Sequence, residues 1–381
     1  MSVTAAQGFV ATGIEVGLKK SGGKDVAIVQ NLGPQKAAAV VFTSNRAKAN
    51  PIIWSQQVIT DGIVEAIILN SGGANCYTGA KGFQVTHSTA EAVGEKLGVS
   101  AGDVLVCSTG LIGDQLPLEK IVAGIEIATL TKDGGDAASE AILTTDTHAK
   151  RSIVTADGWT IGGMAKGAGM LAPGLATMLV VITTDAVVDS ASLDTALRAA
   201  THVTFDRLDS DGCMSTNDQV TLLASGASGV VPDPAEFGAA VTAVCGELAQ
   251  LLQEDAEGAS HDIVIETVHA VTEDDAVEVG RAVARNNLFK AAVFGNDPNW
   301  GRVLAAIGTT SAPFDPYDVD VSMNGVMVCR SGEPGEPRDL VDLTARRVHV
   351  LIDLKVGDAT ATILTNDLTH DYVHENSAYS S

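Results

Sequence analysis

Residues 162–185 read GGMAKGAGMLAPGLATMLVVITTD, and the predicted architecture follows from this segment. It begins as glycine-rich backbone, in which little side chain stands between the main chain and a ligand. Pro173-Gly174 predicts a turn. The apolar and β-branched run Met178–Thr184 predicts a buried strand. Thr177 therefore places a hydroxyl group at the point where a loop becomes a buried strand.

The hydroxyl of Thr177 needs help to react, because a threonine is a weak nucleophile unless a base lies beside it. If the Ala176–Thr177 peptide bond were cut, Thr177 would carry a free α-amino group. Such a group has an ordinary pKa of roughly 7.7–8.0, which suits proton transfer near neutral pH. One residue would then supply both nucleophile and base. From the pattern alone, an ordinary core strand after a glycine turn is the commoner explanation.

A family resemblance changes that balance. The segment KGAGMLAPGLATML, residues 166–179, closely resembles the signature of the ornithine acetyltransferases, also called glutamate N-acetyltransferases of arginine biosynthesis. Members of that family cleave themselves before the threonine of an Ala-Thr-Met-Leu segment, which implies cleavage between Ala176 and Thr177. The new terminal threonine then carries the acetyl group. The resemblance extends along nearly the whole chain.

Composition excludes several other functions. The chain of 381 residues has 24 Lys and Arg against 47 Asp and Glu, a net charge of −23, so neither nucleic acid nor an anionic membrane is an expected partner. The five cysteines are scattered without CxxC spacing, which predicts neither a zinc site nor a disulfide framework. No apolar run approaches the ~20 residues of a membrane span, and the N-terminal segment lacks a signal-peptide layout. We expect a cytoplasmic enzyme with reduced thiols.

The segment VLVCSTGLIG, residues 104–113, runs from a predicted strand into Ser-Thr-Gly. A backbone N–H at an unhindered glycine beside a hydroxyl group is what an oxyanion hole requires. Thr-Gly pairs are far too common to indicate this alone, but the resemblance implies that Thr109 and Gly110 stabilise the tetrahedral oxyanion. The segment ILTTDT, residues 142–147, also matches the family, which implies that Thr144 contacts substrate.

Lys166 lies in the glycine-rich part of the central segment. Gly167, Gly169 and Ala172 nominally satisfy a GxGxxG/A pattern, but a proline and a strand follow where a helix should begin. A P-loop would need Gly-Lys-Ser/Thr, so nucleotide binding is not predicted. A solvated lysine remains the simple explanation. The resemblance instead makes Lys166 a substrate contact, and an ammonium group suits the α-carboxylate of an amino acid.

The segment DAEGASHD, residues 255–262, aligns with a Glu-Gly-Ala-Thr-Lys segment of the family. Alone, Glu257 would be a surface acid at a helix end; the resemblance implies that it binds a substrate ammonium group. The final ENSAYSS corresponds to a tail that returns to the active site, which implies substrate contacts for Asn376 and Ser381. Two positions depart from the family, Met214 where threonine is usual and His261 where lysine is usual, so no role is carried over to either.

We expect an α+β protein with antiparallel sheets layered against helices, of the N-terminal-nucleophile type that the resemblance implies. Residues 1–231 would form the main catalytic domain, and residues 232–381 a smaller α/β domain whose tail reaches the active site. Its first helix is indicated by Asp233-Pro234-Ala235-Glu236, an N-cap followed by proline and glutamate. After cleavage, residues 1–176 would be the α chain and residues 177–381 the β chain, assembled as a dimer of heterodimers (α2β2).

The resemblance implies a ping-pong reaction in which Thr177 takes the acetyl group of N-acetylornithine and gives it to glutamate, without metal or organic cofactor. Some members of the family also accept acetyl-coenzyme A as donor, which this sequence does not decide. Two alternatives stay open. One is a hydrolase on the same scaffold, an aminopeptidase or amidase in which water replaces glutamate; the other is a non-catalytic amino-acid-binding protein.

Overall fold

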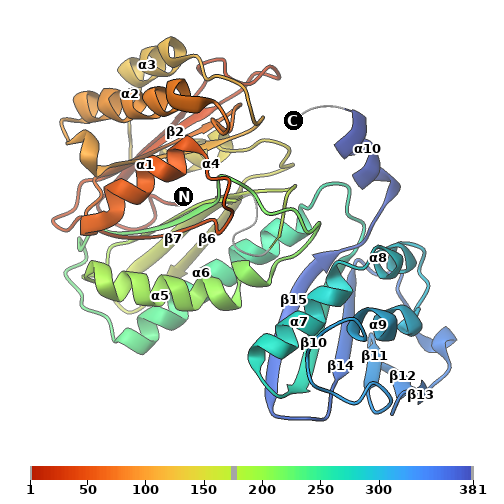
Figure 1. Ribbon diagram of the computed structural model, residues 1–381. Helices are drawn as coiled ribbons and strands as arrows, with labels where there is room; N and C mark the ends of the chain where they lie inside the picture. Colours follow the sequence, from red (N-terminus) through yellow and green to blue (C-terminus); the bar gives the residue numbers. More distant parts are fainter. Residues whose placement is uncertain (1, 173–177, 379–381) are drawn as a thin grey trace.

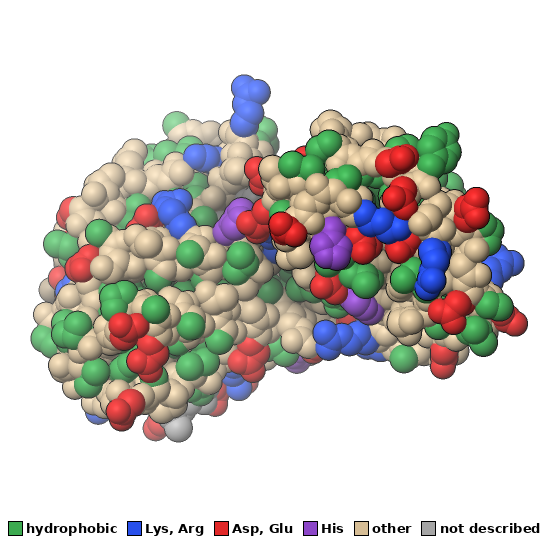
Figure 2. Space-filling view, turned by 90° about the horizontal axis from the view of Figure 1, so that it is seen from below, with side chains coloured by type: hydrophobic (Ala, Val, Ile, Leu, Met, Phe, Trp, Pro, Cys, Tyr) green, Lys and Arg blue, Asp and Glu red, His purple; other side chains and the backbone are tan. Residues whose placement is uncertain are grey.

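The structure is a computed structural model that describes residues 2–172 and 178–378. Ala176, Thr177 and Ser381, which the sequence assigns to cleavage, catalysis and substrate contact, lie outside the described residues. The chain forms two lobes, one built on two sheets and the other on a third (Figure 1). On the face drawn in Figure 2, acidic side chains are scattered over both lobes.

The first sheet of the first lobe has four strands in the order β1-β2-β4-β5. β4 and β5 are parallel and the other pairs are antiparallel. One face of the sheet carries three helices, with a buried cluster that includes Ile28, Ile68 and Val106. The elements are β1 Phe9–Ile14, β2 Val26–Asn31, β4 Ala66–Ser71, β5 Val104–Thr109, α1 Asn50–Val58, α2 Gly79–Leu97 and α3 Leu118–Ile127.

The second sheet has five strands in the order β3-β9-β8-β7-β6. β8 and β9 are parallel, and the remaining neighbours are antiparallel. Two long helices cover its outer face. The elements are β3 Ala37–Phe42, β6 Lys150–Thr155, β7 Thr160–Lys166, β8 Leu179–Thr184, β9 Gln219–Ala224, α5 Ser190–Val203 and α6 Pro234–Glu254.

The two sheets of the first lobe pack face to face. Val29 and Leu69 from the first sheet share one buried cluster with Met164 and Val181 from the second, together with the short helix α4 (Gly135–Ala141) at the edge. Two layers of helices thus enclose two layers of strands. The α+β class predicted from the sequence is confirmed, although each sheet contains one parallel pair and is therefore mixed.

The second lobe contains a six-stranded sheet in the order β13-β12-β11-β14-β10-β15. Its own buried cluster, which includes Ile265, Phe289 and Val350, lies between this sheet and its helices. The elements are β10 Asp262–Ala270, β11 Asp320–Met323, β12 Val326–Arg330, β13 Glu333–Pro334, β14 Arg347–Asp353, β15 Ala359–Asn366, α7 Glu273–Ala284, α8 Asn287–Phe294, α9 Trp300–Ile307 and α10 His370–Ala378. Figure 1 shows α10 turning back toward the first lobe.

Helix α6 joins the two lobes. By length and composition it could cross a membrane, the one such helix among the described residues. Its apolar side, including Val241, Val244 and Leu248, is buried against the five-stranded sheet, as in a core helix of a folded domain. The division into domains at residue 232 stays a prediction. Helix α6 covers the five-stranded sheet of the first lobe, and the buried cluster of the second lobe begins at Ile263. We therefore propose that the domain boundary follows α6.

Candidate active site

The chain that directly follows Thr177 is fixed on two sides. Leu179, the first residue of β8, pairs with Lys166 at the end of β7. The backbone N–H of Met178 donates a hydrogen bond of 3.1 Å to Asp218 Oδ1. Asp218 is fully buried, and this burial raises the pKa of its carboxyl group well above the ordinary value. The residues that surround this point make up the candidate site.

Lys166, predicted to contact substrate, and Thr109, predicted to stabilise the oxyanion, come together at this point. Each is the last residue of its strand, β7 and β5, in different sheets of the first lobe. Lys166 Nζ lies 3.3 Å from Thr109 Oγ1, and both side chains are buried. Burial lowers the pKa of Lys166, and the nearby carboxylate of Asp146 acts in the opposite direction. The ends of the two sheets thus meet in a buried polar contact.

Gly110 occupies backbone that only glycine accepts readily. Its φ is +127°, and a Cβ added there would lie 2.5 Å from the backbone nitrogen of Gly73. The turn that contains Gly72 and Gly73 follows β4, the parallel neighbour of β5, and both of its N–H groups donate to the carbonyl of Thr109 at 2.9 Å. Two glycine turns are therefore packed together beside the Thr109 hydroxyl. The N–H groups of Gly72 and Gly73 are thus already occupied, so Gly110 is the glycine whose N–H is a candidate oxyanion donor beside that hydroxyl.

A buried ion network, which the sequence analysis missed, lies beneath Thr144. Asp146 accepts the N–H of Thr144 at 3.0 Å through Oδ2, and the N–H of Gly167 at 2.6 Å through Oδ1. Lys150 Nζ lies 2.7 Å from Asp146 and 2.6 Å from Asp255. Burial alone would raise the pKa of Asp146, but the charges of Lys166 and Lys150 outweigh it and hold that pKa at about 2. The network fixes three loops relative to one another.

Part of this network had a signal in the sequence. Asp146 stands two residues after Thr144, and Asp255 two residues before Glu257, inside the segments that resemble the family. Nothing in either segment indicates that Lys150, on β6, joins the two carboxylates. Their pairing becomes visible only when the fold brings residues 146 and 255 to the same ammonium group.

Glu257 and Asn376, both assigned from the sequence, are also brought together. Asn376 Nδ2, on α10, donates to Glu257 Oε2 at 3.0 Å. The backbone N–H of Glu257 donates to the carbonyl of Ala168 at 3.0 Å, so this loop lies against the glycine-rich segment. A Cβ added at Gly169 would lie 2.6 Å from the carboxylate of Glu257, so this carboxylate lies directly against the backbone of Gly169. Glu257 therefore rests on the segment that begins at Lys166.

Two cavities flank the loop of Thr144 and Thr145. One of about 380 Å³ is lined by Gly72, Gly110, Thr144 and residues 18–21, and the other of about 400 Å³ by Thr147, Asp255 and Glu257 among others. Thr145 lines both. Each volume is within the roughly 300–1,000 Å³ usual for small-molecule sites. Three of the predicted residues, Gly110, Thr144 and Glu257, therefore lie along these two adjoining spaces.

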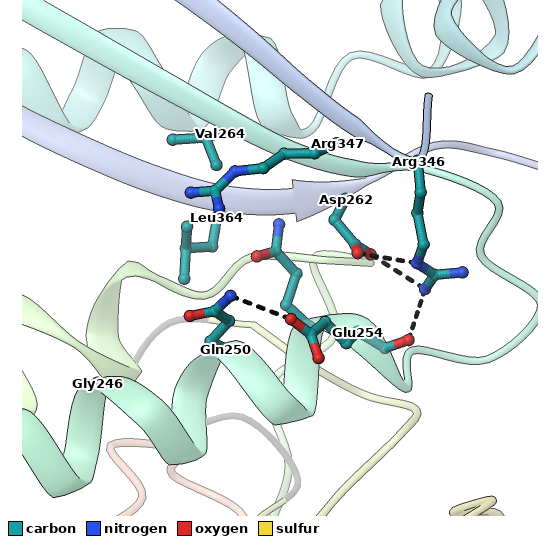
Figure 3. Close-up of a pocket in the computed structure, with 9 residues that line it drawn as sticks. Gly246, Gln250, Glu254, Asp262, Val264, Arg346, Arg347 and Leu364 are labelled. Carbon is teal, nitrogen blue, oxygen red and sulfur yellow. Dashed lines mark hydrogen bonds and ion pairs between the residues drawn. The ribbon is translucent and has the colours of Figure 1, made fainter. Parts of the chain in front are cut away.

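A third cavity, of about 230 Å³, lies between α6 and the six-stranded sheet (Figure 3). Within the described part of the chain, none of the residues predicted for the site line it. Its wall includes Arg346, whose guanidinium group is paired with Asp262 at 2.8 Å and donates to the carbonyl groups of Glu254 and Ala259. Arg346 therefore ties together both ends of the loop that carries Glu257.

Metal binding has little support in the part of the chain that the structure describes. Within residues 2–172 and 178–378, no group of three or more His, Cys, Asp or Glu side chains is arranged to hold a metal ion. The polar groups at the site are instead ammonium groups, carboxylates, hydroxyls and glycine N–H groups. Such groups can bind an amino acid and stabilise a negative charge that develops on a carbonyl oxygen.

Known proteins resemble this chain along nearly its whole length. The model of the ArgJ family matches residues 10–381. The arginine biosynthesis bifunctional protein ArgJ of Streptomyces avermitilis is 64% identical, and that of Mycobacterium leprae 54%; the alignments cover 100% of this chain and 100% and 96% of those proteins. A crystal structure of ornithine acetyltransferase complexed with ornithine, from Mycobacterium tuberculosis, is 50% identical with a TM-score of 0.45, covering 47% of this chain and 96% of that one. The chain belongs to the ArgJ family.

Proposed function

We propose that this protein transfers an acetyl group from N-acetylornithine to glutamate through an acetyl ester of Thr177, giving ornithine and N-acetylglutamate. The relatives, which are named as bifunctional proteins of arginine biosynthesis, support the reaction. The observation that carries the proposal is the buried contact between Lys166 and Thr109 where β8 begins. This contact supports the proposal, because Lys166 pairs with Leu179, two residues after Thr177, and its ammonium group reaches the Thr109 hydroxyl.

In the first half of the reaction, cleavage of the Ala176–Thr177 bond frees the α-amine of Thr177. This amine takes the hydroxyl proton as the oxygen attacks the acetyl carbonyl carbon of N-acetylornithine. Thr109 and the N–H of Gly110 stabilise the resulting oxyanion. Because Lys166 donates to Thr109 Oγ1, the proton of Thr109 is free to point toward that oxyanion. The C–N bond then breaks, and ornithine leaves with the proton held by the Thr177 amine.

In the second half, the α-amine of glutamate attacks the same acetyl carbon, now part of the threonine ester. The oxyanion forms in the same place, the C–O bond breaks, and the proton lost by glutamate returns to the threonine oxygen. N-acetylglutamate leaves and Thr177 is restored. Every proton moves within the site, so the steps require no metal or organic cofactor.

We assign the substrate contacts by charge. Lys166 binds the α-carboxylate and Glu257 binds a substrate ammonium group, since each pairing joins opposite charges. Thr144, Asn376 and Ser381 complete the contacts through hydroxyl and amide groups. The lining of the second cavity by Glu257, and of the first by Thr144, supports this assignment. We further propose a cytoplasmic enzyme in which α and β chains form a dimer of heterodimers.

Mass spectrometry of the purified protein tests the proposal. With N-acetylornithine alone, the fragment that begins at Thr177 should gain one acetyl group, and added glutamate should remove it. Ornithine release that is indifferent to glutamate would instead identify a hydrolase. An uncleaved chain that binds amino acids without turnover would identify a binding protein. Acetylation of the same fragment by acetyl-coenzyme A would add that compound as a second donor.

A further inference from the structure

The two cavities that flank the loop of Thr144 and Thr145 differ in charge. The cavity of about 400 Å³, which we call the acidic cavity, is lined by four carboxylates and one guanidinium group, those of Glu254, Asp255, Glu257, Glu375 and Arg346. The cavity of about 380 Å³, which we call the basic cavity, is lined by Lys19 and Lys20 against a single acid, Asp114. Its charge is the reverse of that of the chain, which has 24 Lys and Arg against 47 Asp and Glu. The two cavities therefore suit substrate groups of opposite charge.

The two substrates of the proposed reaction differ in the same way. N-acetylornithine has an ammonium group at the end of its side chain, whereas glutamate has a second carboxylate there. We propose that the basic cavity is the subsite for a carboxylate of the acceptor glutamate, and that Lys19 binds this carboxylate. The acidic cavity receives the side-chain ammonium group of the donor instead. The inference rests on the proposed function, because it takes glutamate as the acceptor.

Lys19 lies on the loop between β1 and β2, and the backbone of this loop is held in place by Asp25. Asp25 Oδ1 accepts the N–H of Val16 at 2.7 Å. Its Oδ2 accepts the N–H groups of Leu18 at 2.5 Å and of Lys19 at 3.3 Å. Because the backbone beneath Lys19 is already ordered, a bound ligand would need to order only the side chain.

The ammonium group of Lys19 has hydrogen-bond donors left for a ligand. Its Nζ donates to the carbonyl of Leu143 at 3.3 Å, and an ammonium group has three N–H donors. Burial lowers the pKa of Lys19, and the charges of Asp25 and Asp146 act in the opposite direction. Neither carboxylate forms an ion pair with Lys19 in the described part of the chain, since Asp25 is occupied by backbone N–H groups and Asp146 is paired with Lys150. A ligand carboxylate would therefore supply a direct partner for a partly buried cation.

The basic cavity adjoins the proposed reaction centre. Gly110, the candidate oxyanion donor, lines this cavity together with Thr144. Lys19 and Lys166 both lie within electrostatic reach of Asp146, so their ammonium groups are near one carboxylate. Glutamate carries its two carboxylates on one short chain and can turn about its amine until Lys166 holds one of them and Lys19 the other. The amine then stays beside the acetyl group that it attacks.

The acidic cavity disfavours a second carboxylate of a ligand. Burial raises the pKa of Glu375, and the nearby charge of Glu257 raises it further. These two side chains therefore already repel each other, and a ligand carboxylate between them would add to the repulsion. An ammonium group in the same place would relieve it. The charges of the two cavities thus separate the donor from the acceptor by the group at the end of the side chain.

Variants of Lys19 separate its charge from its size. Lys19→Gln and Lys19→Met keep most of the length of the side chain without the charge, and two such variants guard against a folding defect in one of them. Lys19→Arg keeps the charge. The matched control is Lys24→Gln, because Lys24 lies on the same loop, is paired with Glu140 at 2.5 Å, and lines neither cavity.

The second half of the reaction tests the role of Lys19. Each protein is acetylated with N-acetylornithine, separated from excess donor and mixed with glutamate or with glutamine, which has no side-chain charge; mass spectrometry follows the loss of the acetyl group. The wild type should prefer glutamate, and in Lys19→Gln and Lys19→Met this preference should fall by about 10–100-fold. Lys19→Arg and Lys24→Gln should keep the preference, and acetylation by N-acetylornithine should be unchanged in all variants.

The outcomes distinguish this inference from the proposed function. A merely structural role of Lys19 would slow both acceptors equally, so an unchanged preference in Lys19→Gln would overturn the inference while acetyl transfer stands. A wild type without preference for glutamate would do the same and needs no variant. A protein that forms no acetyl ester would remove the proposed function, and calorimetry of glutamate binding would then decide the role of Lys19. The Kd should rise by about 10–100-fold in Lys19→Gln, and an equal Kd, or no binding to the wild type, would refute that role.

Discussion

The ammonium group of Lys166 lies 3.3 Å from the hydroxyl oxygen of Thr109, although the two residues end strands of different sheets. The contact therefore joins the end of β7, in one sheet of the first lobe, to the end of β5, in the other sheet. Leu179, two residues after Thr177, pairs with Lys166. Substitutions in and around this contact should therefore affect self-cleavage, catalysis, substrate binding and stability to different extents.

Thr177→Ala should abolish self-cleavage, because it removes the proposed attacking hydroxyl. On a denaturing gel the wild type should migrate as two fragments and the variant as one chain of 39.1 kDa. Thr195→Ala, which changes an exposed threonine of α5, should still be cut. Identical migration of the wild type and Thr177→Ala would remove the cleavage proposal.

Thr109→Val should lower kcat by about 10²–10³, the usual effect of removing one oxyanion donor. The variant keeps the shape of the side chain but removes the hydroxyl group, which is both the proposed oxyanion donor and the acceptor of the hydrogen bond from Lys166. KM should change much less than kcat. Thr89→Val provides the control, since this buried threonine bonds only within α2, to the carbonyl of Val85. Equal kcat in the wild type and Thr109→Val would show that Thr109 does not stabilise the oxyanion.

Glu257→Ala should raise the KM for N-acetylornithine by about 10–100-fold, the equivalent of one hydrogen bond to a charged group at about 1.5–3 kcal/mol. Self-cleavage should continue, because the proposed partner of Glu257 is the ligand. Glu247→Ala changes another acid, on α6, that accepts a hydrogen bond from Ser152 and lines neither cavity, and it should leave KM unchanged. Loss of cleavage together with normal transfer by a pre-cut sample would contradict the assignment.

Lys150→Met should lower the free energy of unfolding by about 3–5 kcal/mol, because Asp146 and Asp255 would lose the cation that both contact while buried. Urea unfolding measures the change. The exposed pair of Lys24 and Glu140 gives the comparison, and Lys24→Met should cost at most about 1 kcal/mol. Similar losses in the two variants would mean that the buried network contributes little.

The pH dependence of stability should report on Asp146. Its pKa in the folded protein is about 2, below the roughly 3.9 of an unfolded aspartate. The ionised carboxylate therefore stabilises the fold fully above about pH 4, and this contribution is lost as the pH falls toward about 2. The stability difference between the wild type and Asp146→Asn should shrink over that range. If the stability difference between the two proteins grew as the pH fell, the pKa of Asp146 would not be lowered in the folded protein.

Local features of the fold could be predicted from the sequence. The apolar run from Met178 predicted a strand, and β8 extends over Leu179–Thr184. Asp233 and Pro234 predicted a helix start, and the Asp233 side chain accepts the N–H groups of Ala235 and Glu236 at the beginning of α6. Each of these features depends on residues within one or two turns of the chain, which is why a local pattern suffices.

Features that depend on distant partners could not be predicted. Sequence motifs indicate Thr109, Lys166 and Glu257 as site residues. Lys150 and Asp255 are 105 residues apart, and nothing in the sequence around either residue predicts that they pair. His261 departs from the family pattern, so the sequence predicts no role for it, yet it contacts Asp367, 106 residues further along the chain. No role is predicted for Met214 for the same reason, yet its carbonyl accepts a hydrogen bond of 3.0 Å from the side chain of Asn45. Such pairings are decided by the fold.

The strand order of the five-stranded sheet has a consequence for the cleaved enzyme. β8 and β9 come from the chain after residue 177, yet they are inserted between β3 and β7, which come from the chain before it. The products of a cut at 176–177 would be interleaved by backbone hydrogen bonds on both flanks. Neither half could leave without exposing two unpaired strand edges, so halves produced separately should aggregate unless they are synthesised together.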